Sequence, residues 1–140
     1  MSSYVVDASV AAKWFLQEPH SEAALRLLAD PHKLRAPDLL WVELSSVVCR
    51  RIGRKQLPRD EGFLVLSTLR RLPVQIFAAT ELLGAAADMA CDTVTSLYDC
   101  IYLALAIRLG VPMVTADRRF WRGISRTALA PHILWVEEIS

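Results

Sequence analysis

Short apolar runs alternate with helix-length segments along this chain, and this alternation limits the fold more than any other feature. The apolar runs lie at residues 4–6, 34–36, 74–77, 112–115 and 133–136. Helical patterns fill the intervals at 8–16, 22–29, 38–51, 59–71, 80–90 and 98–109, and a short helix follows residue 117. Strands separated by helices form a mostly parallel sheet that is covered on both faces. We therefore expect an α/β fold.

Length and composition indicate one domain with a substantial core. We expect the 140 residues to form a single domain, 1–140, and 54% of them are hydrophobic against 22% charged. The mean hydropathy of +0.31 is high for a small monomer, so we expect an exposed apolar patch and a protein partner. The net charge of +1 does not by itself indicate a nucleic-acid binder, but it allows an acidic pocket beside local basic clusters.

Nothing in the sequence indicates a membrane or an oxidising compartment. No uninterrupted apolar stretch reaches the roughly 18 residues of a membrane span, and charged residues interrupt the N-terminal segment. The three cysteines, Cys49, Cys91 and Cys100, are an odd number without a CxxC spacing, which is typical of a reducing compartment. We expect a cytoplasmic protein with no membrane contact.

Four acidic side chains lie beside strongly apolar segments. They are Asp7, Glu43, Asp99 and Asp117. A carboxylate so close to a core is costly unless it is neutralised, and four converging carboxylates repel one another unless they hold a hard cation such as Mg²⁺ or Mn²⁺. Asp7 and Asp117 each follow a predicted strand, and the carboxyl ends of such strands collect at one edge of the sheet. These features favour a metal-dependent phosphodiesterase that acts on RNA.

Each acid also has a purely structural explanation. Asp7 and Asp117 stand where a helix N-cap is expected, and Asp99 would be the N3 acid of a capping box that begins at Ser96. Glu43 would be a solvated helix residue. Taken one at a time, the acids leave both explanations open.

Four segments of the chain resemble the PIN-domain ribonucleases, and most of all the toxin half of VapBC toxin–antitoxin modules. They are VVDASVAAKWFL, APDLLWVELSSVV, LYDCIYLALAIRLG and PMVTADRRF, and they occur in the order of the family motifs. The resemblance implies a three-layer α/β/α sandwich with a mostly parallel sheet of about five strands. It also implies cleavage of RNA that depends on Mg²⁺, for which Mn²⁺ can substitute, a toxin role, a small antitoxin partner and a homodimer.

The resemblance assigns roles to residues of this chain. The catalytic and metal-binding acids of the family fall on Asp7, Glu43, Asp99 and Asp117. We expect Asp7 and Asp99 to be the principal ligands, with the other two acids completing the site and orienting the attacking water. The accessory hydroxyls fall on Ser9 and Thr115, which would orient the carboxylates or act as local backbone-bonding groups. One metal ion and two remain equally open.

Two groups of basic residues are candidate RNA contacts. Arg50 and Arg54 follow the helix that carries Glu43, and Arg118 and Arg119 follow Asp117. Contacts from such residues to phosphates supply affinity with little sequence preference. A helix dipole explains the first pair equally well. The second pair opens a helix, where the dipole disfavours cations, so a phosphate or an acidic partner is favoured there.

The large aromatic residues and the function class leave alternatives. The aromatic residues are Trp14, Phe15, Trp41 and Trp121, which either fill the core or line a groove for the antitoxin. A non-cleaving PIN-like module that binds RNA or protein is the alternative function, although four intact acids argue against it. An aspartyl-phosphate enzyme is disfavoured because the segment Asp7-Ala8-Ser9 has no second acid two residues on.

Overall fold

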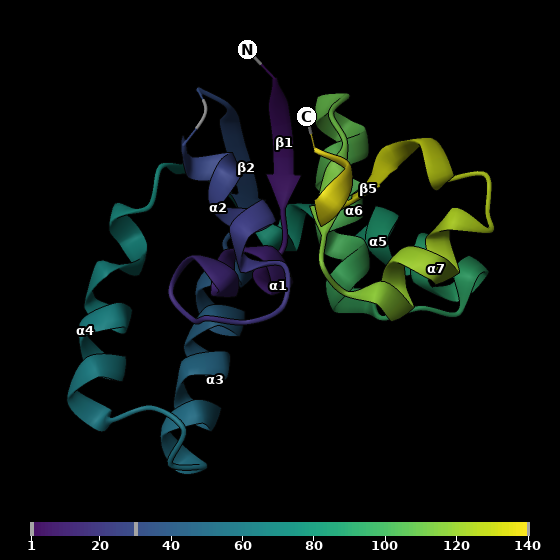
Figure 1. Ribbon diagram of the computed structural model, residues 1–140. Coiled ribbons are helices and arrows are strands. Elements are labelled where there is room, and N and C mark those ends of the chain that lie inside the picture. Colours follow the sequence, from purple (N-terminus) through teal and green to yellow (C-terminus); the bar gives the residue numbers. More distant parts are fainter. Residues whose placement is uncertain (1, 30, 140) are drawn as a thin grey trace.

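The core of the fold is a sheet of five parallel strands (Figure 1). The computed structural model describes residues 2–29 and 31–139. The strands are β1 (Ser3–Val6), β2 (Lys33–Pro37), β3 (Val74–Phe77), β4 (Met113–Thr115) and β5 (Ile133–Trp135). All four pairings are parallel, in the spatial order β3-β2-β1-β4-β5. The parallel sheet expected from the sequence is confirmed.

The strand order reverses between β1 and β4. From β1 the chain adds β2 and β3 on one side, and then returns to place β4 and β5 on the other side. Such a reversal leaves a crevice at the carboxyl ends of the two central strands, where α/β proteins bind ligands. Val6 pairs with Val114, so Asp7 and Thr115 emerge next to each other at this crevice.

Helices cover both faces of the sheet, which gives the three layers. On one face α6 (Leu97–Leu109) packs against β1, β2 and β4, and α5 (Leu83–Thr93) covers α6. On the other face α2 (Ser21–Ala29) and the C-terminal 3₁₀ turn Val136–Glu138 enclose the second apolar cluster, which includes Tyr4, Val6 and Val114. Because successive strand residues face opposite sides, Val5 belongs to the α6 layer while its two neighbours belong to the α2 layer.

Four further helices lie at or beyond the carboxyl edge of the sheet. After β1 comes the short α1 (Ala8–Ala11), and α3 (Leu39–Gly53) packs against both α1 and β2. The outer helix α4 (Arg59–Thr68) lies along α3, away from the sheet (Figure 1). On the other side of the crevice, α7 (Arg118–Ser125) follows β4 and packs against β5.

Several predicted boundaries differ from the structure. The helix predicted at 8–16 is α1 followed by a 3₁₀ turn, Ala12–Trp14. The next helix was predicted with Thr80 as its N-cap, but Thr80 lies inside a 3₁₀ turn at Ala79–Leu82, and α5 begins at Leu83. The carboxylate of Asp38 accepts a hydrogen bond from the Ala79 amide (3.0 Å), so a residue from another part of the chain satisfies the first amide of this 3₁₀ turn. Strand β5 ends at Trp135, one residue earlier than predicted.

The four large aromatic residues belong to the edges of the core. Trp14, Phe15, Trp41 and Trp121 are half-buried and pack against the core clusters. The Trp14 indole also donates a hydrogen bond to the carbonyl of Ala24 (2.9 Å). The exposed apolar side chains are different ones and include Val42, Phe63, Leu64, Val94 and Tyr98.

No single helix in residues 2–29 and 31–139 has both the length and the apolar composition needed to cross a membrane. The consecutive helical segments Ala79–Thr93 and Leu97–Leu109 are long and apolar enough only when taken together, and they are bent by 117° relative to each other.

Candidate active site

Asp7 lies at the point where the strand order reverses, and it is almost completely buried, with 2% of its surface exposed. One carboxylate oxygen accepts hydrogen bonds from the Ser9 hydroxyl (2.6 Å) and the Val10 amide (3.1 Å). The other oxygen accepts a hydrogen bond from the Thr115 hydroxyl. Asp7 therefore caps α1, as its structural explanation requires, and also presents an acid at the crevice.

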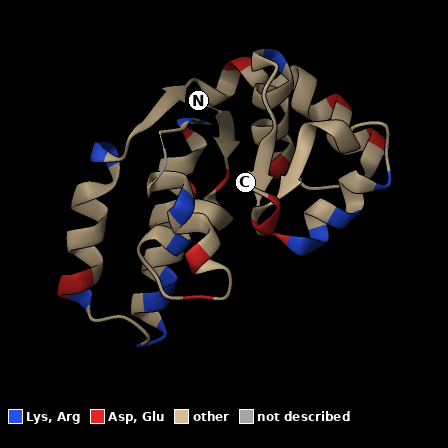
Figure 2. Ribbon diagram, turned by 45° about the horizontal axis from the view of Figure 1, so that its top comes forward, with Lys and Arg blue, Asp and Glu red and all other residues tan. Residues whose placement is uncertain are grey.

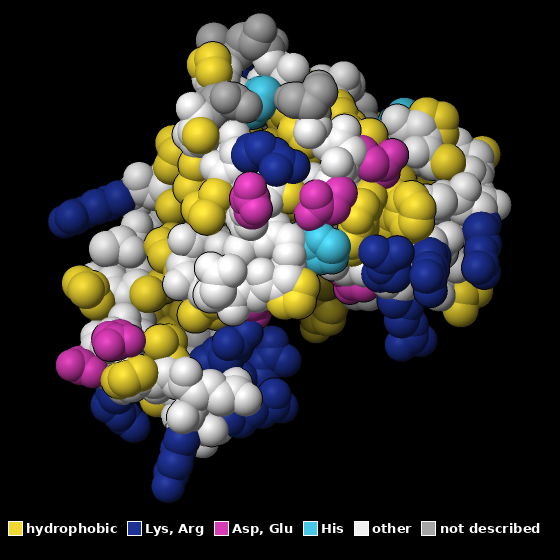
Figure 3. Space-filling view, in the orientation of Figure 1, with side chains coloured by type: hydrophobic (Ala, Val, Ile, Leu, Met, Phe, Trp, Pro, Cys, Tyr) yellow, Lys and Arg dark blue, Asp and Glu magenta, His cyan; other side chains and the backbone are white. Residues whose placement is uncertain are grey.

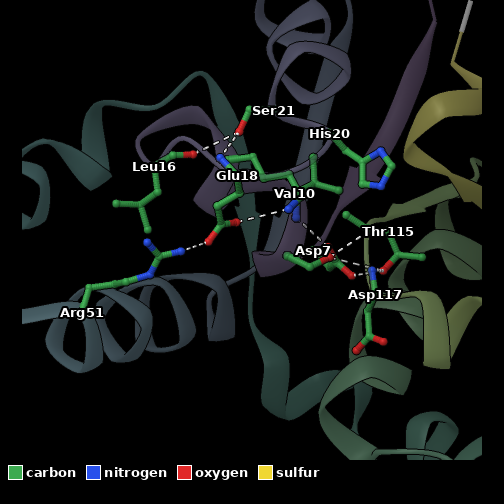
Figure 4. Close-up of polar contacts among 12 residues, drawn as sticks. Asp7, Val10, Leu16, Glu18, His20, Ser21, Arg51, Thr115 and Asp117 are labelled. Carbon is green, nitrogen blue, oxygen red and sulfur yellow. Dashed lines mark hydrogen bonds and ion pairs between the residues drawn. The ribbon is translucent and has the colours of Figure 1, made fainter. Parts of the chain in front are cut away.

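The two hydroxyl groups join the carboxyl ends of β1 and β4. The Ser9 oxygen accepts a hydrogen bond from the Ala116 amide (2.9 Å), and the Thr115 oxygen accepts one from the Asp117 amide (3.1 Å). The Thr115 side chain is fully buried. Figure 4 shows Thr115 and Asp117 beside Asp7. These contacts fix the orientation of the Asp7 carboxylate and place Asp117 near it.

The remaining acids come from three helices around the same crevice. Asp117 caps α7, where its carboxylate accepts a hydrogen bond from the Phe120 amide (3.1 Å). Asp99 lies in the first turn of α6, where its backbone amide donates a hydrogen bond to the Ser96 hydroxyl at 3.5 Å. Glu43 lies on α3 and accepts a hydrogen bond from the Tyr102 hydroxyl (2.7 Å).

The charges of the other three acids all act on the pKa of Asp99, which links the four acids electrostatically. Burial raises the pKa of Asp7 to about 6, against the opposing effect of its hydrogen bonds. The pKa of Asp99 is raised to about 7, mainly by burial and also by the charges of Asp7, Asp117 and Glu43. Burial also raises the pKa of Glu43, while the Tyr102 hydrogen bond opposes that rise. Acids from β1, α3, α6 and α7 therefore repel one another across a shared space.

Two cavities meet at these acids. The first, of about 460 Å³, is lined by all four acids and by Arg50, Arg51 and Arg54. The second, of about 750 Å³, shares Asp99 and Asp117 with the first, and its basic lining residues are Arg118, Arg119, Arg122 and Arg126.

Basic residues therefore flank the acids on both sides. The ribbon of Figure 2 carries blue segments at the end of α3 and along α7. The space-filling view in Figure 3 shows two separate groups of Lys and Arg side chains, one near α3 and one over α7. The sequence predicted both basic groups, and the structure places them in two cavities that share Asp99 and Asp117.

The acids have no cationic side chain as a partner within the described ranges. Lys13 and Arg51 line the first cavity, but both form ion pairs with Glu18 instead, and Figure 4 shows Arg51 reaching Glu18. A buried carboxylate without a counter-charge is unfavourable, which leaves room for a metal ion to stabilise the cluster.

The donor chemistry fits Mg²⁺ or Mn²⁺. Carboxylates and hydroxyls supply oxygen ligands, which these hard cations prefer. Among residues 2–29 and 31–139, no three His, Cys, Asp or Glu side chains already surround a single ion position. An ion held by these acids would keep several waters, which is the usual mode of Mg²⁺ binding in proteins.

Sequence reasoning missed two features of the site. The first is Tyr102, which holds Glu43 and lies one helical turn after Asp99. Its three-residue spacing from Asp99 places both side chains on one face of α6, and this spacing was the available signal. The second is the cluster of Lys13, Glu18 and Arg51, for which the sequence separation of 33 residues between Glu18 and Arg51 gave no signal.

Comparison with known proteins identifies the class that this fold and acid set define. The family model described as PIN domain matches residues 4–123, and the chain belongs to the PIN-domain family. Within that family it groups with the VapC ribonucleases. It is 30% identical over 117 residues to Ribonuclease VapC3 of Pyrobaculum aerophilum, which covers 82% of this chain and 89% of that one. It is 33% identical over 115 residues to Ribonuclease VapC9 of Mycobacterium tuberculosis, which covers 82% and 86%.

A solved structure supports the same fold assignment. A toxin–antitoxin complex from Klebsiella pneumoniae contains a chain that superposes with a TM-score of 0.63 at 18% identity, covering 97% of this chain and 99% of that one. At this level of identity the likeness shows the fold alone. The resemblance drawn from the four sequence segments and the three-layer fold that it implied are both confirmed.

Proposed function

We propose that this protein is a divalent-metal-dependent endoribonuclease and the toxin of a toxin–antitoxin pair. The observation that carries the proposal is the convergence of four carboxylates in a cavity flanked by arginines, where burial and the charges of the other three acids raise the pKa of Asp99. The names of the VapC relatives state a ribonuclease activity, and this chain has an acid at each of the four motif positions.

Mg²⁺ is the proposed cofactor, and Mn²⁺ substitutes for it. Asp7 and Asp99 would hold the ion, and Asp117 and Glu43 would complete the site directly or through water. When bound, the ion offsets the charge of the phosphodiester and lowers the pKa of a bound water. The Ser9 and Thr115 hydroxyls keep both oxygens of Asp7 in place during this chemistry. Either Glu43 or Asp117 would accept the proton of the attacking water as general base.

RNA is the proposed substrate, and it would lie along both cavities. Arg50 and Arg54 line the first cavity, and Arg118 and Arg119 line the second. A strand held through its phosphates on both sides of the acids is cleaved internally, which makes the enzyme an endonuclease. Phosphate contacts of this kind give affinity that depends strongly on salt and weakly on sequence.

A small antitoxin is the proposed protein partner, as in the complex from Klebsiella pneumoniae. Exposed apolar side chains on α3 and α4, among them Val42, Phe63 and Leu64, give the chain more apolar surface than an isolated small protein needs. A homodimer is proposed from the family resemblance.

The test of this function uses Asp7→Asn and Asp99→Asn. Each variant should fold and should lose Mg²⁺-dependent cleavage of RNA. Expression of the wild-type chain alone in bacteria should arrest growth, and the Asp7→Asn chain at equal soluble level should not. Wild-type cleavage by folded Asp99→Asn would rule out the proposed site. RNA binding without any Mg²⁺-dependent cleavage by the wild type would favour the non-cleaving module.

A further inference from the structure

Tyr102 is a fully buried residue whose hydroxyl reaches the candidate active site from behind. It lies on α6, one turn after Asp99, and donates a hydrogen bond of 2.7 Å to one oxygen of Glu43 on α3. It lines neither of the two cavities that contain the acids. Tyr102 therefore cannot touch a substrate in this site, and any effect on the chemistry must pass through Glu43.

The hydrogen bond fixes Glu43 in a particular way. Glu43 has two carboxylate oxygens, and Tyr102 occupies one of them, Oε1. Within the described part of the chain, no other side chain or amide donates to this carboxylate. The second oxygen therefore stays available at the cavity that Glu43 lines, together with Asp7 and Asp99.

The same bond links the two helices that carry two of the acids. Asp99 and Tyr102 lie on the same face of α6, because residues three apart on a helix are neighbours. Glu43 comes from α3, 59 residues earlier in the chain than Tyr102. The Tyr102 hydroxyl therefore connects the Glu43 side chain on α3 to the helix that carries Asp99.

We propose that Tyr102 is a positioning residue that orients Glu43 toward the divalent ion of the active site. This inference rests on the proposed function. If only a buried ring were needed at this position, phenylalanine would fill it equally well. The hydroxyl of Tyr102 adds the hydrogen bond to Glu43. Groups that orient a metal ligand by hydrogen bonding contribute roughly 10–100-fold to metal affinity or activity. A role limited to tying α3 to α6 would affect folding but not the affinity of the folded protein for the ion.

The experiment compares four chains: wild type, Tyr102→Phe, Glu43→Gln and the double variant. Mn²⁺ alone is titrated into each full-length chain without RNA, and free Mn²⁺ is measured by electron paramagnetic resonance. Tyr102→Phe should weaken Mn²⁺ binding by about tenfold or more. The double variant should bind no more weakly than Glu43→Gln alone, because Tyr102 acts only through Glu43. Tyr98→Phe removes a hydroxyl from an exposed tyrosine on the same helix and should leave Mn²⁺ binding unchanged.

Two results would overturn the inference. One is wild-type Mn²⁺ affinity in folded Tyr102→Phe, and the other is a further loss in the double variant equal to the loss from Tyr102→Phe alone. If wild type cleaves RNA with Mg²⁺ while either result is found, the inference fails and the proposed function stands. If wild type neither binds Mn²⁺ nor cleaves RNA, both fail.

A measurement on the unmutated protein covers the case in which Tyr102→Phe does not fold. The chain has three tyrosines, so ¹³C labelling of the tyrosine ring carbon that bears the hydroxyl gives three nuclear magnetic resonance signals. Addition of Mg²⁺ should move the Tyr102 signal with the same half-saturation as metal binding and leave the Tyr4 signal in place. A Tyr102 signal that stays fixed at saturating Mg²⁺ contradicts the positioning role.

Discussion

Helices α6 and α4 differ strongly in burial. The buried helix α6 carries an acid of the candidate active site, whereas the exposed helix α4 carries none. In α6 every residue from Cys100 to Ala106 is buried, since the sheet lies on one side and α5 on the other. In α4 the only buried residue is Gly62, and Phe63 and Leu64 are exposed. Asp99 stands in the first turn of the buried helix, so its carboxylate is partly desolvated at the cavity.

The glycine explains how α4 is attached. A Cβ atom added to Gly62 would lie 2.4 Å from the terminal methyl of Ile52 and 3.2 Å from a methyl of Val48, both on α3. Helices approach this closely only where one of them lacks a side chain. We therefore expect substitutions near the start of α6 to alter chemistry and substitutions on α4 to alter stability.

The largest effect is expected at the site end of α6. Asp99→Asn should reduce the rate of Mg²⁺-dependent RNA cleavage at least about 100-fold, the upper range for loss of a group that supports a metal site. The matched control is Asp60→Asn, the same chemical change at an exposed position on α4, which should keep the wild-type rate. Initial rates and circular dichroism spectra measure the two properties. Equal loss of activity in both variants would contradict the proposed division between the two helices.

The acids should make the metal-free protein less stable as pH rises. The folded-state pKa values of Asp7 and Asp99, about 6 and about 7, lie above the value of 3.8 expected when the chain is unfolded. The folded state therefore binds protons more tightly. This contribution to stability is fully present below pH 3.8 and is lost as pH rises through about 6 and about 7. For Asp7 the difference in pKa corresponds to about 3 kcal/mol.

The loss of stability with pH is measured by denaturant unfolding in the presence of a chelator. The measurements run from about pH 5 to about pH 8, a range that brackets both pKa values. Asp7→Asn should flatten the decline and should be more stable than wild type at the alkaline end. Mg²⁺ at a hundredfold excess over its dissociation constant should restore about 2.7 kcal/mol to wild type and less to the variant. A free energy of unfolding that rises with pH in chelator would contradict the electrostatic account of the site.

Substitutions of two glycines, one on α4 and one on α5, test how closely these helices pack against their neighbours. Gly62→Val should lower the free energy of unfolding by about 1–3 kcal/mol, because the added atoms meet Ile52 and Val48 on α3. Gly84 on α5 has no atom within 4 Å of an added Cβ, so Gly84→Ala should raise the same quantity by about 1 kcal/mol through helix propensity. Cleavage per folded molecule should match wild type in both. Reduced cleavage in folded Gly62→Val would place α4 closer to the chemistry than the structure does.

The smallest effect is expected from single arginines along the cavities. Arg54→Ala and Arg118→Ala, one on each side of the acids, should each reduce the salt slope of RNA binding by about 1. Arg59, which lies over the Phe63 ring on α4, supplies a matched control, and Arg59→Ala should leave the slope unchanged. Binding is measured in chelator at several salt concentrations. An unchanged slope in both cavity variants would exclude them as phosphate contacts.

Local patterns in the sequence were enough for the sheet and for part of the site. Each apolar run has the length of a strand, and the helices between the runs require parallel neighbours. Asp7 and Asp117 could be placed at one edge because residues that follow parallel strands meet there, whatever the details of packing. The same local chemistry makes both of them helix caps in the structure, so their structural and functional roles coincide.

The helical boundaries show where local reasoning ends. The 3₁₀ turn that precedes α5 begins at Ala79, whose amide bonds to Asp38, 41 residues away in the sequence. Val94 ends α5 in a left-handed conformation that a β-branched residue rarely adopts, and no sequence rule would place it there.

By itself the sequence determined the strands, the helices and the acids at the ends of β1 and β4, since these follow from periodicity and from the direction of parallel strands. Only the tertiary structure decided that Tyr102 holds one oxygen of Glu43. It also decided that Arg51 pairs with Glu18 rather than with an acid of the site. The physical reason is that these contacts join residues 59 and 33 positions apart, and their geometry comes from the packing of α3 against the rest of the fold.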